Sequence, residues 1–172
     1  MNGSACEHVT NKLVQLMQHR RSSIWTLGTG TKTPQEFISL LRTYSIQVVA
    51  DVRRFPSSRF PHFHRDAFRE LIENAGLTYV WMGDNLGGYR KGGYEQHMGT
   101  DTFVEGLARL EELARQSPVA IVCAETLPWR CHRRHIAQAL SRRGWDVVHI
   151  IDEKRTWVDP RAEDTLPLFP EP

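Results

Sequence analysis

Pro118-Val-Ala-Ile-Val-Cys123 is continuously apolar, with β-branched side chains at several positions. Such a run is typical of a strand buried on both faces, because a strand with one wet face alternates apolar and polar residues. Strands buried in this way belong to parallel sheets that helices cover on both sides. The segment therefore predicts the central strand of an α/β domain.

Further segments with strand character lie to either side, at 23–27, 47–51, 78–81 and 146–151. Helical patterns separate them, over 34–44, 65–75, 102–117 and 131–143. Two capping boxes mark helix starts, Thr33 with Glu36 and Thr102 with Glu105. This alternation predicts an α/β fold, a single Rossmann-like domain with a mainly parallel five-stranded sheet flanked by helices on both faces.

The ends of the chain differ from this core. We expect a helical extension over 1–22, the α/β domain over 23–158, and a flexible Pro-rich acidic tail over 159–172. The formal net charge is only +2, so global charge selects no partner. Three cysteines are too few for a disulfide scaffold, and the polar start and lack of a long apolar run argue against a signal peptide or a membrane span. These features predict a cytoplasmic protein.

Chemically distinctive residues gather in the segments after the predicted strands. Since parallel strands end at one sheet edge, we expect 28–32, 51–64, 82–99 and 123–130 to converge, with 82–99 forming either an ordered wall or a closing lid. Arginine forks and glycine backbones in one crevice favour an anion site, most naturally for phosphate, with solvated surface charge as the alternative. The expected substrate contacts are Arg53, Arg54, Arg59, Gly87, Gly88, Tyr89, Arg90, Tyr94, Trp129, Arg130 and Arg133.

Two carboxylates follow predicted strands and are candidates for general acid–base catalysis. Glu125 comes two residues after the central strand, where partial desolvation would raise its pKa. Asp51 ends the neighbouring strand and is its expected partner. The alternative is that both carboxylates form ion pairs with the surrounding arginines.

Cys123, Cys131 and His132 permit three interpretations. As metal ligands they lack short Cys-x-x-Cys pairs and an obvious fourth member, although a divalent metal ion stays open as a cofactor. Cys131 or its neighbour His132 could act in catalysis, since a thiol at a helix start can have a lowered pKa. Alternatively, both cysteines are packing residues.

Three motifs together are similar to one known family: ADVRRFPSSR (50–59), DNLGGYR (84–90) and VCAETLPWRCHRRHIA (122–137). From about Ile24 to Ile151 the chain resembles the bacterial and archaeal family called domain of unknown function 488. The resemblance implies a Rossmann-like α/β domain and no particular reaction. It also implies a site around Asp51, Arg53, Gly87, Gly88, Cys123, Glu125, Cys131, His132 and Arg133.

The tail contains Thr165-Leu-Pro-Leu-Phe169. This stretch is similar to the peptides with which bacterial repair and replication proteins dock on the DNA sliding clamp, although those usually begin with Gln. Leu166, Leu168 and Phe169 would fill an apolar pocket on that partner. The alternatives are a tail that folds back on the domain and a chance match.

The leading hypothesis is an enzyme, in the nucleoid if it acts on DNA, that works on nucleic acid or a nucleotide in DNA repair. Its expected reaction is glycosidic-bond hydrolysis by Glu125 with Asp51, with Tyr89, Tyr94 or Trp129 stacking on an extruded base. A second hypothesis is thiol or metal chemistry at Cys123, Cys131 and His132. A third is a non-catalytic nucleic-acid-binding module that docks on the sliding clamp.

Overall fold

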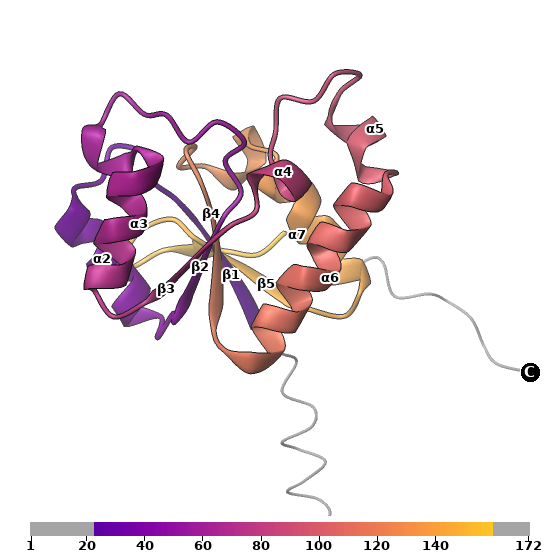
Figure 1. Cartoon of the computed structure of the whole chain (residues 1–172). Helices are drawn as coiled ribbons and strands as arrows, with labels where there is room; N and C mark the ends of the chain where they lie inside the picture. The colour runs from indigo at the N-terminus through magenta and orange to yellow at the C-terminus, as the bar shows by residue number, and fades with distance from the viewer. Residues whose placement is uncertain (1–22, 160–172) are drawn as a thin grey trace, which may run out of the picture.

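The computed structural model describes residues 23–159, and the expected N-terminal helix and the sliding-clamp motif lie outside these residues. The described chain forms one six-stranded sheet in the order β3-β2-β4-β1-β5-β6 (Figure 1). The strands are β1 (Ser23–Gly28), β2 (Val48–Asp51), β3 (Thr78–Trp81), β4 (Val119–Cys123), β5 (Asp146–Ile150) and β6 (Thr156–Trp157). β4 is buried along its whole length, as its sequence predicts.

The first five strands are parallel, and the prediction of five strands misses the short antiparallel β6. β6 pairs with β5 through Thr156 and Trp157 only. Its turn is closed by Asp152, whose carboxylate accepts the backbone N–H groups of Lys154 and Arg155. Two residues are too few to produce a recognisable strand pattern, which is why the sequence does not reveal this strand.

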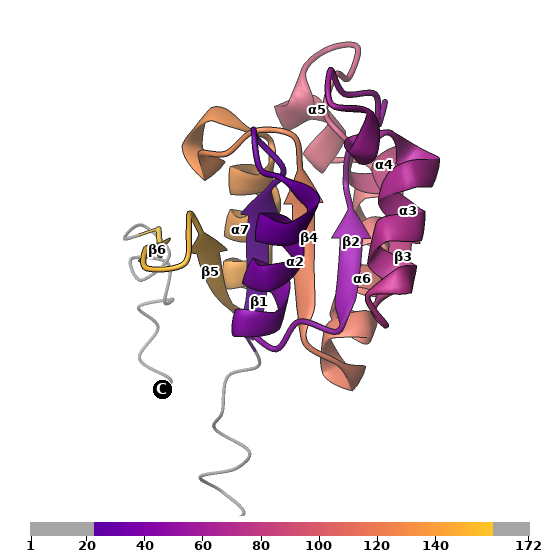
Figure 2. The same ribbon diagram turned by 90° about the vertical axis from the view of Figure 1, so that its left-hand side faces the viewer.

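Helices cover both faces of the sheet, as expected (Figure 2). On one face, α2 (Pro34–Thr43) and α3 (Arg65–Asn74) contribute the buried Phe37, Leu41, Phe68 and Ile72. The other face is covered by α4 (Gly83–Leu86), α6 (Asp101–Gln116) and α7 (Arg133–Arg142), which share a second apolar core with the strands. The sheet is therefore the middle layer of three. No helix among residues 23–159 is long and apolar enough to cross a membrane.

One of the two predicted capping boxes is confirmed. Thr33 accepts the N–H of Glu36, and the Glu36 carboxylate accepts the N–H of Thr33 at 2.7 Å. The prediction at Thr102 is wrong, because α6 starts at Asp101 and its cap is Thr100, whose hydroxyl accepts the N–H of Phe103. Thr102 already lies within the first helical turn, so its backbone is not in the extended conformation that a cap requires.

Two further expected boundaries are corrected. The segment 82–99, expected as one long loop, contains α4 and the short α5 (Tyr94–Met98). The last helix begins at Arg133 rather than at Cys131, because Pro128–Arg130 form a separate 3₁₀ turn before it. Cys131 and His132 therefore lie in the connection between this turn and α7.

The order of the strands places a topological switch between β1 and β4. From β1 the chain crosses to β2 on one side of this pair, and from β4 it crosses to β5 on the other side. The segments that follow β1 and β4 are hydrogen-bonded to each other. The N–H groups of Thr29 and Gly30 donate to the carbonyls of Cys123 and Ala124 at 2.8 and 2.9 Å. Open α/β sheets bind ligands at such a point, beside the carboxyl ends of their strands.

Candidate active site

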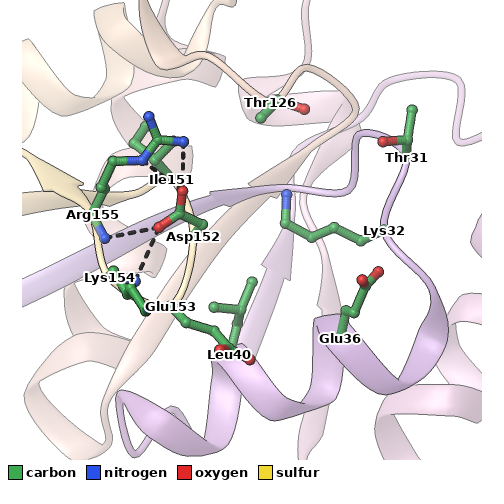
Figure 3. A pocket seen from close by; sticks show the side chains of 10 residues that line it. All are labelled: Thr31, Lys32, Glu36, Leu40, Thr126, Ile151, Asp152, Glu153, Lys154 and Arg155. Atoms are coloured by element: carbon green, nitrogen blue, oxygen red, sulfur yellow. Dashed lines mark hydrogen bonds and ion pairs between the residues drawn. The ribbon is translucent and has the colours of Figure 1, made fainter.

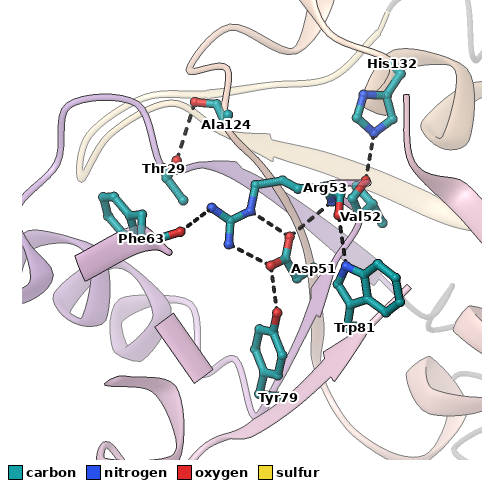
Figure 4. A network of polar contacts seen from close by, with 9 residues as sticks. All are labelled: Thr29, Asp51, Val52, Arg53, Phe63, Tyr79, Trp81, Ala124 and His132. Atoms are coloured by element: carbon teal, nitrogen blue, oxygen red, sulfur yellow. Dashed lines mark hydrogen bonds and ion pairs between the residues drawn. The ribbon is translucent and has the colours of Figure 1, made fainter. Parts of the chain in front are cut away.

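A buried ion pair fixes the loop after β2 (Figure 4). The Arg53 guanidinium donates to both carboxylate oxygens of Asp51, from Nε to Oδ1 at 2.8 Å and from Nη2 to Oδ2 at 2.7 Å. Tyr79 donates its hydroxyl to Asp51 Oδ2 at 2.8 Å, and Arg53 Nη1 donates to the Phe63 carbonyl at 2.7 Å. Asp51 is fully buried and its oxygens are occupied by these donors. This geometry gives Asp51 and Arg53 a structural role and keeps both away from solvent.

Glu125 does not lie in the desolvated position that its sequence context predicts. β4 ends at Cys123, so Glu125 already belongs to the loop, and its side chain is exposed. Its Oε1 accepts the N–H of Thr126 at 3.1 Å. The pairing of Glu125 with Asp51 is also not assembled, because the Asp51 carboxylate is bound to Arg53 and Tyr79.

Cys131 is the residue of this edge with the most unusual environment. Its sulfur is 3.6 Å from His132 Nδ1 and accepts the backbone N–H of Arg133 at 3.4 Å. A hydrogen bond from Cys123 lowers the pKa of the Cys131 thiol, and the adjacent His132 and the charge of Arg133 lower it further, which outweighs the effect of burial. Cys131 is partly exposed, and these interactions favour the thiolate form of its side chain.

Cys123 complements Cys131. It ends β4 with only 2% of its surface exposed, and burial raises the pKa of its thiol well above the ordinary value. The neighbouring Cys131 raises the pKa of Cys123 further, while the Cys123 thiol donates to the Glu125 carbonyl at 3.8 Å. The pKa values of the two cysteines are thus shifted in opposite directions, upward for buried Cys123 and downward for partly exposed Cys131.

Arg133 is the largest fully buried side chain among the described residues. Its Nη2 donates to the carbonyls of Glu125 at 2.6 Å and Thr126 at 3.2 Å, and its Nη1 donates to Thr26 Oγ1 at 3.3 Å. Its Nε has no hydrogen-bond partner within residues 23–159, and no carboxylate of this range forms an ion pair with it. Arg133 is thus a buried cation held by two backbone carbonyls and a hydroxyl, and its charge favours the deprotonated form of Cys131.

His132 is fixed between the loops that follow three strands. Its Nε2 lies 3.2 Å from the Val52 carbonyl (Figure 4), and its Nδ1 faces Cys131. Gly88 packs on the ring, because a Cβ there would lie 3.0 Å from His132 Nδ1. The centroid of the Tyr94 ring lies 5.3 Å from that of His132, and the Tyr94 hydroxyl donates to the Leu86 carbonyl. Tyr94 therefore packs against His132, and this position does not favour its predicted role in stacking on a base.

The other predicted phosphate contacts divide into two groups. Gly87 and Arg90 are used within the third loop, where Arg90 donates to the Gly87 and Gly83 carbonyls at 2.8 and 3.1 Å. By contrast, Arg59 and Arg130 are exposed, and partly buried Arg54 reaches the Tyr89 carbonyl at 2.9 Å. The exposed Arg59 and Arg130 are therefore the predicted contacts best placed to bind an external anion.

Three exposed aromatic side chains stand on three separate loops of this edge: Phe55, Tyr89 and Trp129, with 65%, 89% and 43% of their surfaces exposed. Arg54 lies over the Phe55 ring at 5.4 Å, and Trp129 makes an edge contact with Trp157 of β6. We call this set the aromatic rim. Tyr89 and Trp129 are predicted from the sequence, whereas Phe55 is missed. The sequence feature that could have identified Phe55 is its position directly after Arg53-Arg54, in the loop that follows a predicted strand.

The metal interpretation is not favoured by the arrangement of the side chains. Among residues 23–159, no three His, Cys, Asp or Glu side chains are grouped so as to hold a metal ion. His132 turns one ring nitrogen to a backbone carbonyl and the other to Cys131. Cys131 and His132 thus form a hydrogen-bonded pair, and the buried Cys123 thiol donates to the Glu125 carbonyl.

The fold and this pair define an α/β domain with a cysteine–histidine pair at the carboxyl edge of a parallel sheet. The model of the family Domain of unknown function DUF488 matches residues 33–140, and the chain belongs to this family. The match confirms the resemblance that the sequence motifs indicate. No curated protein and no solved structure matches the chain.

Proposed function

We propose that this protein is an enzyme that uses the Cys131 thiolate as a nucleophile on a nucleic acid or nucleotide. The observation that carries the proposal is the setting of partly exposed Cys131, whose sulfur lies 3.6 Å from His132 Nδ1 and accepts the backbone N–H of Arg133, a buried cation with no carboxylate partner among residues 23–159. Thiolates in partly exposed, electropositive surroundings are the reactive ones.

In the proposed step, the Cys131 sulfur attacks an electrophilic centre of the substrate and forms a covalent bond to it. The leaving group departs with the bonding electron pair and takes a proton. His132, whose Nδ1 is 3.6 Å from the sulfur, is placed to hold that proton. Cys123 stays protonated in this step, because burial raises its pKa.

The aromatic rim supports the choice of substrate class. Exposed aromatic rings interspersed with arginines bind unstacked bases and the phosphates that flank them. A damaged base extruded from DNA is the first substrate to test, in keeping with a role in repair. We also propose that the domain is Rossmann-like, because its parallel strands have a switch point between β1 and β4. Rossmann-like folds bind nucleotides at such a point.

Glycosidic-bond hydrolysis by two carboxylates has less support, because Asp51 is bound to Arg53 and Tyr79. Glycosidases of that kind need both carboxylates free to face the bond. In this proposal the exposed Glu125 is therefore a residue beside the nucleophile, available to exchange protons with a leaving group.

The proposal is tested by the pH dependence of iodoacetamide alkylation, followed by mass spectrometry in a Cys6→Ser background. Below pH 6 an ordinary thiol is mostly protonated, so we expect Cys131 to react at least tenfold faster than a free cysteine there, while Cys123 stays unmodified in the folded protein. A rate at Cys131 that rises only through pH 8–9 would contradict the thiolate.

Activity is tested on oligonucleotides with alkylated, deaminated or oxidised bases, by mass spectrometry of both protein and DNA. We expect a covalent adduct on Cys131 or a changed base, and loss of either with Cys131→Ser. Glu125→Gln is the matched variant, since both residues lie in loops after β4. Activity that survives Cys131→Ser and disappears with Glu125→Gln would show that Glu125, and not Cys131, is the catalytic residue.

A second proposal is a nucleic-acid-binding module without catalysis, and the aromatic rim favours it equally. The tail residues Leu166, Leu168 and Phe169 would then attach the module to the DNA sliding clamp. Binding of single-stranded DNA that weakens steeply with salt, with no product or adduct from any oligonucleotide, would support this alternative.

A further inference from the structure

A cavity of about 780 Å³ lies at the same sheet edge, on the side of α2 and the β5–β6 turn (Figure 3). It opens beside the switch point, because Lys32 belongs to the loop after β1 and Thr126 to the loop after β4. Its volume falls in the range of small-molecule sites. It is lined by Thr31, Lys32, Glu36, Leu40, Thr126, Ile151, Asp152, Glu153, Lys154 and Arg155.

Lys32 supplies the central cation of this cavity. Its ammonium group points into the space between Thr126 and Asp152 (Figure 3) and donates one hydrogen bond, to the Gly28 carbonyl at 3.0 Å. Lysine has three such donors, so two stay available to a ligand. Burial and the neighbouring charge of Arg133 lower the pKa of Lys32, and a bound anion would relieve that repulsion.

Two of the three carboxylates around the cavity are already occupied. Asp152 accepts Arg155 Nε at 2.6 Å and the N–H groups of Lys154 and Arg155. Glu36 accepts the N–H of Thr33 in the capping box. Glu153 is exposed at the rim, where solvent screens its charge. The cavity therefore offers donors to a ligand, with its acceptors mostly engaged.

The remaining lining sets the shape of the ligand. Leu40 and Ile151 are the apolar residues of the lining, and Thr31 and Thr126 add hydroxyl groups to it. An ammonium group with nearby hydroxyls suits a phosphate, and apolar residues beside it suit the flat body of a base.

We propose that this cavity binds a nucleotide phosphomonoester, with its phosphate on Lys32 and its base over Leu40 and Ile151. The ligand is either a free nucleotide or the phosphorylated 5′ end of a strand. Cys131, His132 and Arg133 do not line this cavity, although Arg133 donates to the carbonyl of Thr126, which does. The proposal does not rest on the chemistry of Cys131.

The test is titration calorimetry of the full chain with adenosine 5′-monophosphate, adenosine, inorganic phosphate, and a short oligothymidylate with and without a 5′ phosphate. We expect the monophosphate to bind at least tenfold more tightly than adenosine or inorganic phosphate. Lys32→Met should weaken this binding at least tenfold, whereas Lys32→Arg and the exposed Lys91→Met should change it less than threefold.

Each outcome decides the proposal. Tighter binding of the 5′-phosphorylated oligonucleotide than of the free nucleotide identifies a strand end as the ligand, and the reverse identifies the free nucleotide. Equal binding of adenosine and its monophosphate, equal binding of inorganic phosphate, unchanged binding in Lys32→Met, or no binding of any probe overturns it. Thermal melting of Lys32→Met checks that the variant is folded. Alkylation of Cys131 in the same variant keeps this result separate from the proposed reaction.

Discussion

Arg53 and Arg133 are both buried at the carboxyl edge of the sheet, but their surroundings differ sharply. Arg53 has a bidentate carboxylate partner in Asp51 and a further acceptor in Phe63 O. Arg133 has three oxygen acceptors, an unpartnered Nε, and no carboxylate partner among the described residues. Removing one member of a buried ion pair whose polar atoms all have partners strongly destabilises a structure. A buried charge without a carboxylate partner, next to a cysteine with a shifted pKa, is typical of a functional site. We therefore expect stability to depend on Arg53 and chemistry to depend on Arg133.

Breaking the satisfied pair should have the largest effect on stability. Asp51→Ala leaves the buried Arg53 charge without its carboxylate, so we expect the free energy of unfolding to fall by about 3–5 kcal/mol. Urea denaturation measures this change. The control is Glu112→Ala, which breaks an exposed ion pair with Arg115 and should leave the midpoint nearly unchanged. Equal effects of the two variants would contradict the structural role of Asp51.

Acid should act on the Arg133 region through His149. His149 Nδ1 is 2.7 Å from Thr26 Oγ1, the same hydroxyl that Arg133 contacts, and it also feels the charges of Asp159 and Cys131. Burial and the charge of Arg133 lower the pKa of His149 from 6.5 to about 4. The unfolded chain therefore binds the additional proton between these values, and stability falls as pH decreases from about 6.5 to about 4.

The expected contribution of His149 to this loss is about 3 kcal/mol. Urea denaturation between pH 7 and pH 4 should show a correspondingly smaller loss in His149→Gln, while the exposed His64→Gln retains the full loss. The same pH dependence in wild type and His149→Gln would assign the acid sensitivity elsewhere.

Removing Arg133 should cost the least stability of the three changes. In Arg133→Met the Glu125 and Thr126 carbonyls lose a donor, but no buried charge is left without a partner, so we expect a loss of only about 1–2 kcal/mol. The pKa of Cys131 should rise, because the positive charge that favours its thiolate is gone. Urea denaturation and the alkylation profile measure the two effects. A stability loss as large as that of Asp51→Ala, with an unchanged alkylation profile, would make Arg133 a purely structural residue.

The parts of the fold that were predictable from the sequence are those encoded over short distances. The uninterrupted apolar run of β4 and the Thr33–Glu36 box each fix their own element. The convergence of the loops followed from strand–helix alternation alone, because parallel strands must end at one edge. The Thr102–Glu105 box has the same composition, but the chain turns into α6 earlier, at Thr100. A local pattern thus identified the helix and missed its start.

The roles of the site residues depend on contacts between distant segments, which the sequence does not encode locally. Asp51 and Arg53 are two residues apart, yet the partners that complete their network are Phe63 O and Tyr79. Glu125 appeared buried because the strand before it is buried, but β4 ends before reaching it. The lowered pKa of Cys131 depends on Cys123, Arg133 and His132 lying close to it. The sequence does not show how close these side chains are in the folded protein.

The place of β1 in the sheet has a consequence for how the protein matures. β1 pairs with β4 and β5, whose residues lie about a hundred positions later in the chain. Contacts of such long range form slowly and late in folding. Arg133 bonds to Thr26 of β1, so the surroundings that lower the pKa of Cys131 are complete only when β1 has joined the sheet. The nucleophile proposed above would therefore be assembled in the last stage of folding.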